Sequence, residues 1–165
     1  MADAEHATCP TPGVVAAPDE ALTDLYRREH DAMVRMASVV VGGRAVAEEI
    51  VHDAFAVVAE RWATLDNPGG YLRTTVVNGC RMALRRRAVE QRHDVVAPAP
   101  LDGPAELVEL HHALGRLGER ARVAVVLRYL VGLPDDDIAA ALGCRPATVR
   151  SIVHRALKDL RKELS

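Results

Sequence analysis

Residues 146–163 combine basic and hydroxyl side chains at a spacing that could bind DNA bases. On a helix, Val149, Ile152, Val153, Ala156 and Leu160 form an inward apolar stripe, opposite Thr148, Arg150, Ser151, His154, Arg155 and Lys158. The planar guanidinium of arginine can bond O6 and N7 of guanine together, which discriminates between bases by about 1–3 kcal/mol. We therefore expect Arg150 and Arg155 to make the main base contacts, with Ser151 and His154 secondary.

Two predicted elements position these side chains. Residues 135–142 read as a helix with Ile138, Ala139 and Leu142 inward, Gly143 makes the turn, and Pro146 suits the first turn of the next helix. This order is typical of a helix-turn-helix, whose second helix lies in the major groove. The alternative is a solvated outer helix face; the glycine turn and the helix lengths favour the DNA reading.

A second basic cluster lies in the middle of the chain, on a helix predicted over about 70–92. A polar strip, extended by Arg86 and Arg87, faces away from an apolar side. The strip contains Arg73, Asn78, Arg81 and Arg85, and the apolar side contains Leu72, Val76, Cys80 and Ala83. Such a strip suits phosphate contacts, which position a protein on nucleic acid; the alternative is a solvated arginine end favoured by the helix dipole.

Aromatic residues flank the glycine-rich loop before this helix. Trp62 is expected to pack in the core, whereas for Tyr71 core packing and stacking on an unpaired base both stay open.

Composition favours a helical protein with two differently charged surfaces. Of 165 residues, 49% are hydrophobic but only 3% aromatic, which leaves an Ala/Val/Leu core suited to packed helices. The net charge of −2 argues against nucleic-acid binding, yet it hides an acidic first third and an arginine-rich middle. We therefore expect an all-α fold and two kinds of partner.

Proline- and glycine-rich stretches divide the chain into two small helical domains. We predict a disordered tail over 1–18, a first domain over 19–92, a flexible linker over 93–104 and a second domain over 105–165. The predicted helices span about 19–41, 44–62 and 70–92 in the first domain, and 105–114, 119–131, 135–142 and 146–163 in the second. In the first two helices we expect Tyr26, Val46 and Ile50 to face inward.

Other function classes find little support. The chain contains no Walker loop, dinucleotide fingerprint, His-Glu-x-x-His or Gly-x-Ser-x-Gly, so we expect no enzyme, no catalytic residue and no cofactor. Three widely spaced cysteines indicate neither a disulfide framework nor a metal site, and Cys80 and Cys144 are expected to be inert. No apolar run approaches a membrane span, and a cytoplasmic location is expected.

The order of these motifs resembles that of extracytoplasmic-function (ECF) sigma factors, the small sigma-70 family members that keep only the sigma-2 and sigma-4 domains. AEEIVHDAF (47–55) is similar to the helix of that family that binds core RNA polymerase. YLRTTVVNGCRMALRRR (71–87) is similar to its promoter-melting helix, and DDDIAAALGCRPATVRSIVHRALKDL (135–160) to its helix-turn-helix for the −35 element.

The resemblance implies a role for each candidate residue. Glu49, His52 and Asp53 would face the clamp helices of the polymerase β′ subunit, with Phe55 holding that element and the β subunit as a further partner. The −10 promoter DNA would be bound by Tyr71, Arg73, Asn78, Arg81, Arg85 and Arg86, next to a base-receiving loop over 62–70. The −35 element would meet Arg150, Ser151, His154 and Arg155. Anti-sigma proteins are common partners in that family, and the sequence leaves open whether this chain has one.

The main alternative is a stand-alone helix-turn-helix regulator that binds duplex DNA as a dimer. It leaves the first predicted domain without a role. His52 and Tyr71 stand where the family usually has Gln and Trp, departures that affect specificity more than identity.

Overall fold

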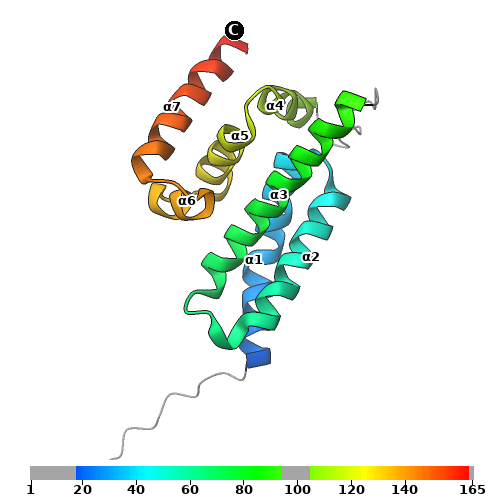
Figure 1. Cartoon of the computed structure of the whole chain (residues 1–165), viewed down its shortest axis with the longest axis vertical. Coiled ribbons are helices and arrows are strands. Elements are labelled where there is room, and N and C mark those ends of the chain that lie inside the picture. Colours follow the sequence, from blue (N-terminus) through cyan, green and yellow to red (C-terminus); the bar gives the residue numbers. More distant parts are fainter. Residues whose placement is uncertain (1–17, 94–104, 164–165) are drawn as a thin grey trace, which may run out of the picture.

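The chain forms an all-α protein, as predicted (Figure 1). The computed structural model describes residues 18–93 and 105–163; the predicted tail, apart from Pro18, and residues 94–104 of the predicted linker lie outside these ranges. The helices are α1 (Pro18–Val41), α2 (Arg44–Arg61), α3 (Pro68–His93), α4 (Ala105–Gly115), α5 (Glu119–Val126), α6 (Asp135–Leu142) and α7 (Pro146–Glu163), with a short 3₁₀ turn at Trp62–Thr64 and a π-helical turn at Leu127–Val131.

Helices α1, α2 and α3 pack side by side around one apolar core (Figure 1). Met33, Val51 and Leu72, one from each helix, are fully buried there. Cys80 is also buried, and desolvation raises the pKa of its thiol to about 12. At neutral pH this cysteine is therefore a protonated core residue, in agreement with the prediction that it is inert.

The predicted inward faces of α1 and α2 were wrong at particular positions. Val46 is exposed, and the buried face of α2 instead begins one residue later, with Ala47 and Val51. Alanine and valine occur all round this helix, so apolar spacing alone does not fix its register. Tyr26 is 39% exposed because its ring lies at the bundle surface, stacked on His30 and tilted against Phe55.

Helices α5, α6 and α7 pack together, with α4 against α7. Their buried residues include Val123, Ile138 and Val153, and they belong to the same hydrophobic cluster as those of α1, α2 and α3. The helix expected over 119–131 is α-helical only as far as Val126 and then widens into the π-helical turn. A hydrogen bond from the Leu133 amide to the Leu127 carbonyl, 3.0 Å long, closes this turn.

The predicted helix-turn-helix is present at α6 and α7, with the predicted glycine turn between them. Gly143 has a left-handed backbone, φ 60°. Its amide and that of Cys144 donate to the carbonyls of Ala140 and Ala139, at 3.3 and 2.9 Å. These two bonds satisfy the last carbonyls of α6 and reverse the chain toward Pro146.

The two helical groups meet at the carboxyl end of α1. There the carbonyls of three consecutive residues, Val39, Val40 and Val41, accept hydrogen bonds from His111 (3.2 Å), Arg122 (2.9 Å) and Arg87 (2.6 Å) respectively. Cationic and N–H donors at the end of a helix also complement its dipole. His111 and Arg122 belong to the second group, whereas Arg87 lies on α3, so its bond ties α3 to α1 within the first group. The packing of the two groups therefore rests partly on two backbone carbonyls, those of Val39 and Val40, that α1 itself cannot satisfy.

Gly42 is the tightest point of this junction, and we expect Gly42→Ala to destabilise the protein. Its φ is +78°, a left-handed conformation that costs other residues about 1–2 kcal/mol. A Cβ there would also lie 2.4 Å from the His111 ring. Gly132→Ala is the matched control, because φ is +77° there but a Cβ would meet nothing within 4 Å. Chemical denaturation should show the larger loss at Gly42; equal losses would contradict the contact with His111.

The junction should also weaken at mildly acidic pH. Burial lowers the pKa of His111, against the opposing effect of its bond to Val39, and the Arg122 charge lowers it further. The unfolded chain therefore binds a proton at this site more readily than the folded one, so stability is lost as pH falls below about 6.5. Denaturant midpoints measured between neutral pH and pH about 5.5 should fall more in the wild type than in His111→Gln; parallel curves would contradict this assignment.

Candidate nucleic-acid interface

The outer face of α7 presents the predicted base-reading residues to solvent. Buried Val149, Val153 and Ala156 hold the opposite face against α5 and α6. The exposed side chains are those of Thr148, Arg150, Ser151, His154, Arg155 and Lys158. The structure thus brings all four predicted −35 residues onto one accessible face.

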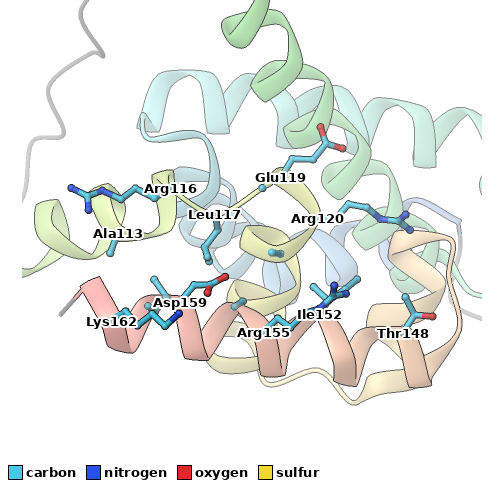
Figure 2. Close-up of a pocket in the computed structure, with 14 residues that line it drawn as sticks. Ala113, Arg116, Leu117, Glu119, Arg120, Thr148, Ile152, Arg155, Asp159 and Lys162 are labelled. Atoms are coloured by element: carbon cyan, nitrogen blue, oxygen red, sulfur yellow. The ribbon is translucent and has the colours of Figure 1, made fainter. Parts of the chain in front are cut away.

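Local hydrogen bonds hold part of this face in place. The Ser151 hydroxyl donates to the Ala147 carbonyl at 3.1 Å, and Nε of Arg155 donates to the Ser151 carbonyl at 3.3 Å. A groove of about 860 Å³ runs between α7 and the α4–α5 segment, and Thr148 and Arg155 lie along its α7 side (Figure 2).

Asp135, the first residue of α6, is a functional candidate that the sequence analysis missed. Its carboxylate pairs with Arg128 of the π-helical turn and lies 3.6 Å from the guanidinium of Arg150. Arg150 itself is still 63% exposed. Asp135 can therefore orient Arg150 without covering it; the signal in the sequence was the acidic start of α6.

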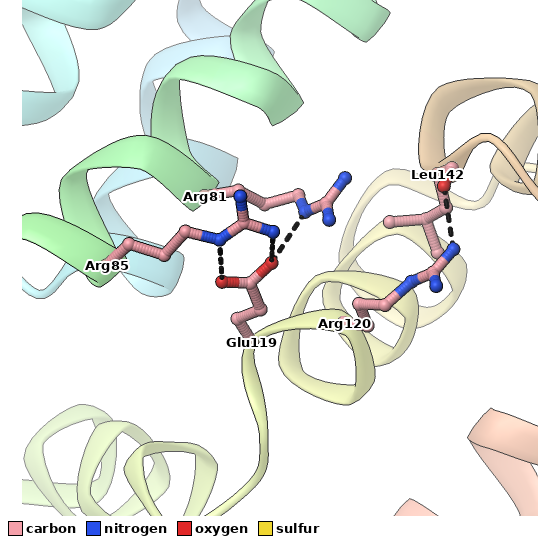
Figure 3. A network of polar contacts seen from close by, with 5 residues as sticks. All are labelled: Arg81, Arg85, Glu119, Arg120 and Leu142. Carbon is pink, nitrogen blue, oxygen red and sulfur yellow. Dashed lines mark hydrogen bonds and ion pairs between the residues drawn. The ribbon is translucent and has the colours of Figure 1, made fainter. Parts of the chain in front are cut away.

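The predicted polar strip of α3 is less accessible than the face of α7. Asn78 and Arg86 are exposed, whereas Arg73 is half-buried and lies 3.8 Å from Glu29 of α1. Arg81 and Arg85 both bind Glu119 of α5 (Figure 3). Of these side chains, Arg81 thus faces the second helical group, whereas Arg85 bonds to Glu119 but stays 63% exposed.

An open pocket lies between the loop before α3, the start of α3 and α6. Oδ1 of Asn67 accepts a bond from the Gly70 amide at 2.9 Å, and the Asn67 carbonyl accepts one from the Tyr71 amide at 3.0 Å. The pocket has a volume of about 460 Å³, and α6 contributes Asp137 and Ala140 to its lining. Trp62 and Tyr71 are both partly buried against the apolar core, as expected for Trp62.

The acidic face of α2 is open to solvent. Three exposed residues share one side of α2: His52 and Asp53 follow Glu49 by three and four residues along the sequence. Phe55 lies inward, 7% exposed, with its ring centroid 4.9 Å from that of Tyr26. Three of the four predicted polymerase-binding residues are thus accessible, and the fourth supports their helix from within.

Residues 18–93 and 105–163 contain no cluster of three or more His, Cys, Asp or Glu side chains arranged to hold a metal ion. None of their helices combines the length and the apolar character that crossing a membrane requires.

Comparison with known proteins identifies the family. Residues 25–89 match the family model described as Sigma-70 region 2, and residues 107–160 match that of Sigma-70, region 4. An RNA polymerase sigma-E factor of Streptomyces coelicolor is 32% identical over 149 residues, which cover 86% of this chain and 84% of that protein. The chain belongs to the sigma-70 family. It is a member of the ECF group, as the resemblance implied.

Other relatives of this sigma factor agree. The ECF RNA polymerase sigma factor SigE of Mycolicibacterium smegmatis is 31% identical over 160 residues, covering 86% of this chain and 61% of that protein. The sigma factor RpoE of Bartonella quintana, solved in complex with the anti-sigma factor NepR, has the same fold, with a TM-score of 0.72 at 24% identity. The match covers 88% of this chain and 97% of the RpoE chain. Sigma factors are in general regulatory proteins rather than enzymes.

Proposed function

We propose that this sigma factor brings core RNA polymerase to specific promoters and helps to open the DNA there. The observation that carries the proposal is that regions 2 and 4 both match, over residues 25–89 and 107–160, on a fold that exposes the reading face of α7. RNA synthesis itself belongs to the polymerase, and this chain supplies no catalytic group. Its place of action is the cytoplasm, where the polymerase works.

The outer face of α7 binds the −35 element in the major groove. Arg150 and Arg155 bond to base edges, with Ser151 and His154 beside them; their exposure and their common face support this role. The ion pair with Asp135 aims Arg150.

The start of α3 and the preceding loop capture the −10 region as the duplex opens. Melting costs stacking of about 1.4 kcal/mol per base-pair step, so capture of an unpaired base is the kind of compensation required. The pocket beside Asn67 and Tyr71 supports this role. The basic and amide groups that contact the strand are those of Arg73, Asn78, Arg81, Arg85 and Arg86.

The exposed side of α2 docks on the polymerase. Glu49, His52 and Asp53 face the clamp helices of β′, and Phe55 holds their helix from inside. Residues 19–92 and 105–165 act as two domains that engage separate parts of polymerase and promoter, and the linker over 93–104 threads the polymerase channel. An anti-sigma factor is a further partner, supported by the complex in which RpoE was solved with the anti-sigma factor NepR.

Run-off transcription tests the proposal. Purified bacterial core polymerase is supplied with a library of promoters, with and without the protein, and the transcripts are mapped. New start sites that depend on the protein are expected. The absence of transcripts, together with sequence-specific duplex binding by the protein alone, would instead favour a stand-alone regulator.

A further inference from the structure

A pocket of about 600 Å³ lies between the carboxyl-terminal half of α3 and the segment that runs from α4 into α5. Basic side chains dominate its lining. The described residues that line it include four arginines (Arg85, Arg87, Arg116 and Arg122), two histidines and one carboxylate, that of Glu119. Because cations gathered around one cleft attract counter-ions, the pocket is a candidate site for an anion.

The carboxylate in this lining is already paired. Glu119 accepts two hydrogen bonds of 2.8 Å from Arg85 and one of 2.9 Å from Arg81 (Figure 3). One negative charge that is shared by two arginines does not also offset the charges of Arg87 and Arg122.

Arg87 and Arg122 themselves bind backbone carbonyls. Arg87 donates to the Val41 carbonyl at 2.6 Å, and Arg122 donates to three carbonyls at 2.8 to 2.9 Å. A carbonyl is a neutral acceptor, so it satisfies an N–H group but leaves the charge of the guanidinium in place. Both side chains are partly buried, and water therefore screens their charges less than it does at an open surface.

The basic side chains of the pocket are close enough to repel one another. Burial lowers the pKa of Arg122, and the nearby charge of Arg87 lowers it further. Burial also lowers the pKa of His111, against the opposing effect of its bond to Val39, and nearby positive charges lower it further. An anion bound among these groups would replace their mutual repulsion with attraction.

The lining indicates phosphate as the anion. Its strongly basic side chains, among the described residues, are arginines, whose planar guanidinium binds a phosphate group through two parallel hydrogen bonds. Several cations around one pocket also match a chain of phosphates better than a single carboxylate, because the chain carries more negative charge. The volume lies within the range of about 300–1000 Å³ that is usual for sites of small molecules.

We propose that this pocket binds a small free polyphosphate anion, held by Arg87 and Arg122 with His112 beside them. The chemistry that the pocket recognises is the phosphate chain, which inorganic pyrophosphate and nucleoside triphosphates share. Both occur wherever RNA is made, because RNA synthesis consumes nucleoside triphosphates and releases pyrophosphate. The inference goes beyond promoter binding and does not depend on it, since the free protein is enough to test it.

Isothermal titration calorimetry of the full-length protein with sodium pyrophosphate, in magnesium-free buffer at neutral pH, tests the site. A single saturable site is expected. ATP should bind as well, whereas adenosine, which lacks phosphate, should not. Tighter binding of ATP than of pyrophosphate would identify a nucleotide as the preferred source of the phosphate chain, and equal binding would identify the chain alone. If neither pyrophosphate nor ATP binds, the proposal is wrong.

Ala88→Glu places a carboxylate in the pocket and removes no existing hydrogen bond. Ala88 lines the pocket at an exposed position of α3, so the variant should fold. We expect its affinity for pyrophosphate to be about 10-fold or more lower, the lower end of the loss of one hydrogen bond to a charged group. Val89→Glu is the matched control, because Val89 is adjacent, 54% exposed and outside the lining. Equal affinities of the two variants would overturn the proposal.

Arg87→Gln tests the arginine directly. It should also bind pyrophosphate about 10-fold or more weakly, because it loses a charged donor to the phosphate. Arg27→Gln removes the same charge from α1, where the side chain is 75% exposed, and should bind like the wild type. Circular dichroism checks that each variant is folded; if Arg87→Gln is not, the pair at Ala88 and Val89 decides the question. Equal affinities of folded Arg87→Gln and Arg27→Gln would contradict the site.

Competition separates a free anion from a nucleic-acid backbone. The pyrophosphate titration is repeated in the presence of a single-stranded oligothymidylate, which carries phosphates but no free phosphate chain. Under the proposal, the affinity for pyrophosphate stays unchanged. If the oligonucleotide displaces pyrophosphate, and Ala88→Glu weakens its binding as well, the pocket belongs to nucleic acid and the proposal of a free anion is overturned.

Discussion

Arg155→Ala should lower transcription from a cognate promoter about 5- to 150-fold at limiting protein, because a bidentate contact to guanine is worth about 1–3 kcal/mol. The Arg155 side chain is exposed, and the bond from its Nε to the Ser151 carbonyl leaves the outer nitrogens of the guanidinium available. The promoter is one identified in the run-off screen. Transcript yield is measured over a titration of the protein with fixed core polymerase.

Two control variants show whether that loss of transcription comes from a base contact or from the loss of a positive charge. Arg155→Lys keeps the charge but not the fork, so it should lose base discrimination while keeping most salt-dependent affinity. Arg27→Ala removes an exposed guanidinium of α1 that lies 3.6 Å from the Asp24 carboxylate, and should leave transcription unchanged. If Arg155→Ala transcribes as well as Arg27→Ala, Arg155 does not read the promoter.

Leu72→Ala should lower the free energy of unfolding by about 2–5 kcal/mol, a large part of the 5–15 kcal/mol typical of a whole protein. Leu72 is fully buried between α1, α2 and α3, so its loss leaves a cavity that fixed helices cannot fill. Urea denaturation followed by circular dichroism measures the change.

Met82→Ala is the matched control for the core, because Met82 lies on the same helix but is 66% exposed. Its effect should stay within about 0.5 kcal/mol. A similarly small effect of Leu72→Ala would mean that the bundle repacks around the site. The loss of unfolding free energy in Leu72→Ala should also be independent of pH, unlike the destabilisation at mildly acidic pH that is expected from His111.

The helix-turn-helix could be predicted closely because residues that start or end helices mark its boundaries. Pro134 and three aspartates begin α6, Gly143 ends it, and Pro146 starts α7, so both helices lie at the predicted bounds. The inward stripe of α7 was also recognisable, since its apolar residues are separated by charged ones. The buried face of α2 could not be recognised in this way, because alanine and valine occur on all sides of that helix. Exposed Val46 has the same residue type as buried Val51 and Val58.

The contacts between the two groups lay beyond sequence reasoning. Glu119 follows Arg81 by 38 residues and Arg85 by 34 along the chain, and nothing in either segment marks the other. Arginine spacing correctly put Arg81 and Arg85 on the polar side of α3, but whether they face water or a partner depends on docking. The same holds for Asp135, whose link to Arg150 requires the turn at Gly143.

The bonds at the end of α1 bear on how freely such a junction can evolve. The carbonyls of Val39, Val40 and Val41 belong to the last turn of a helix, where water can replace a protein donor if the groups separate. Loss of His111 or Arg122 would therefore leave helix-end carbonyls that water can reach once the groups separate. Substitution of these two donors can weaken the closed arrangement without any change in the residues of the apolar core.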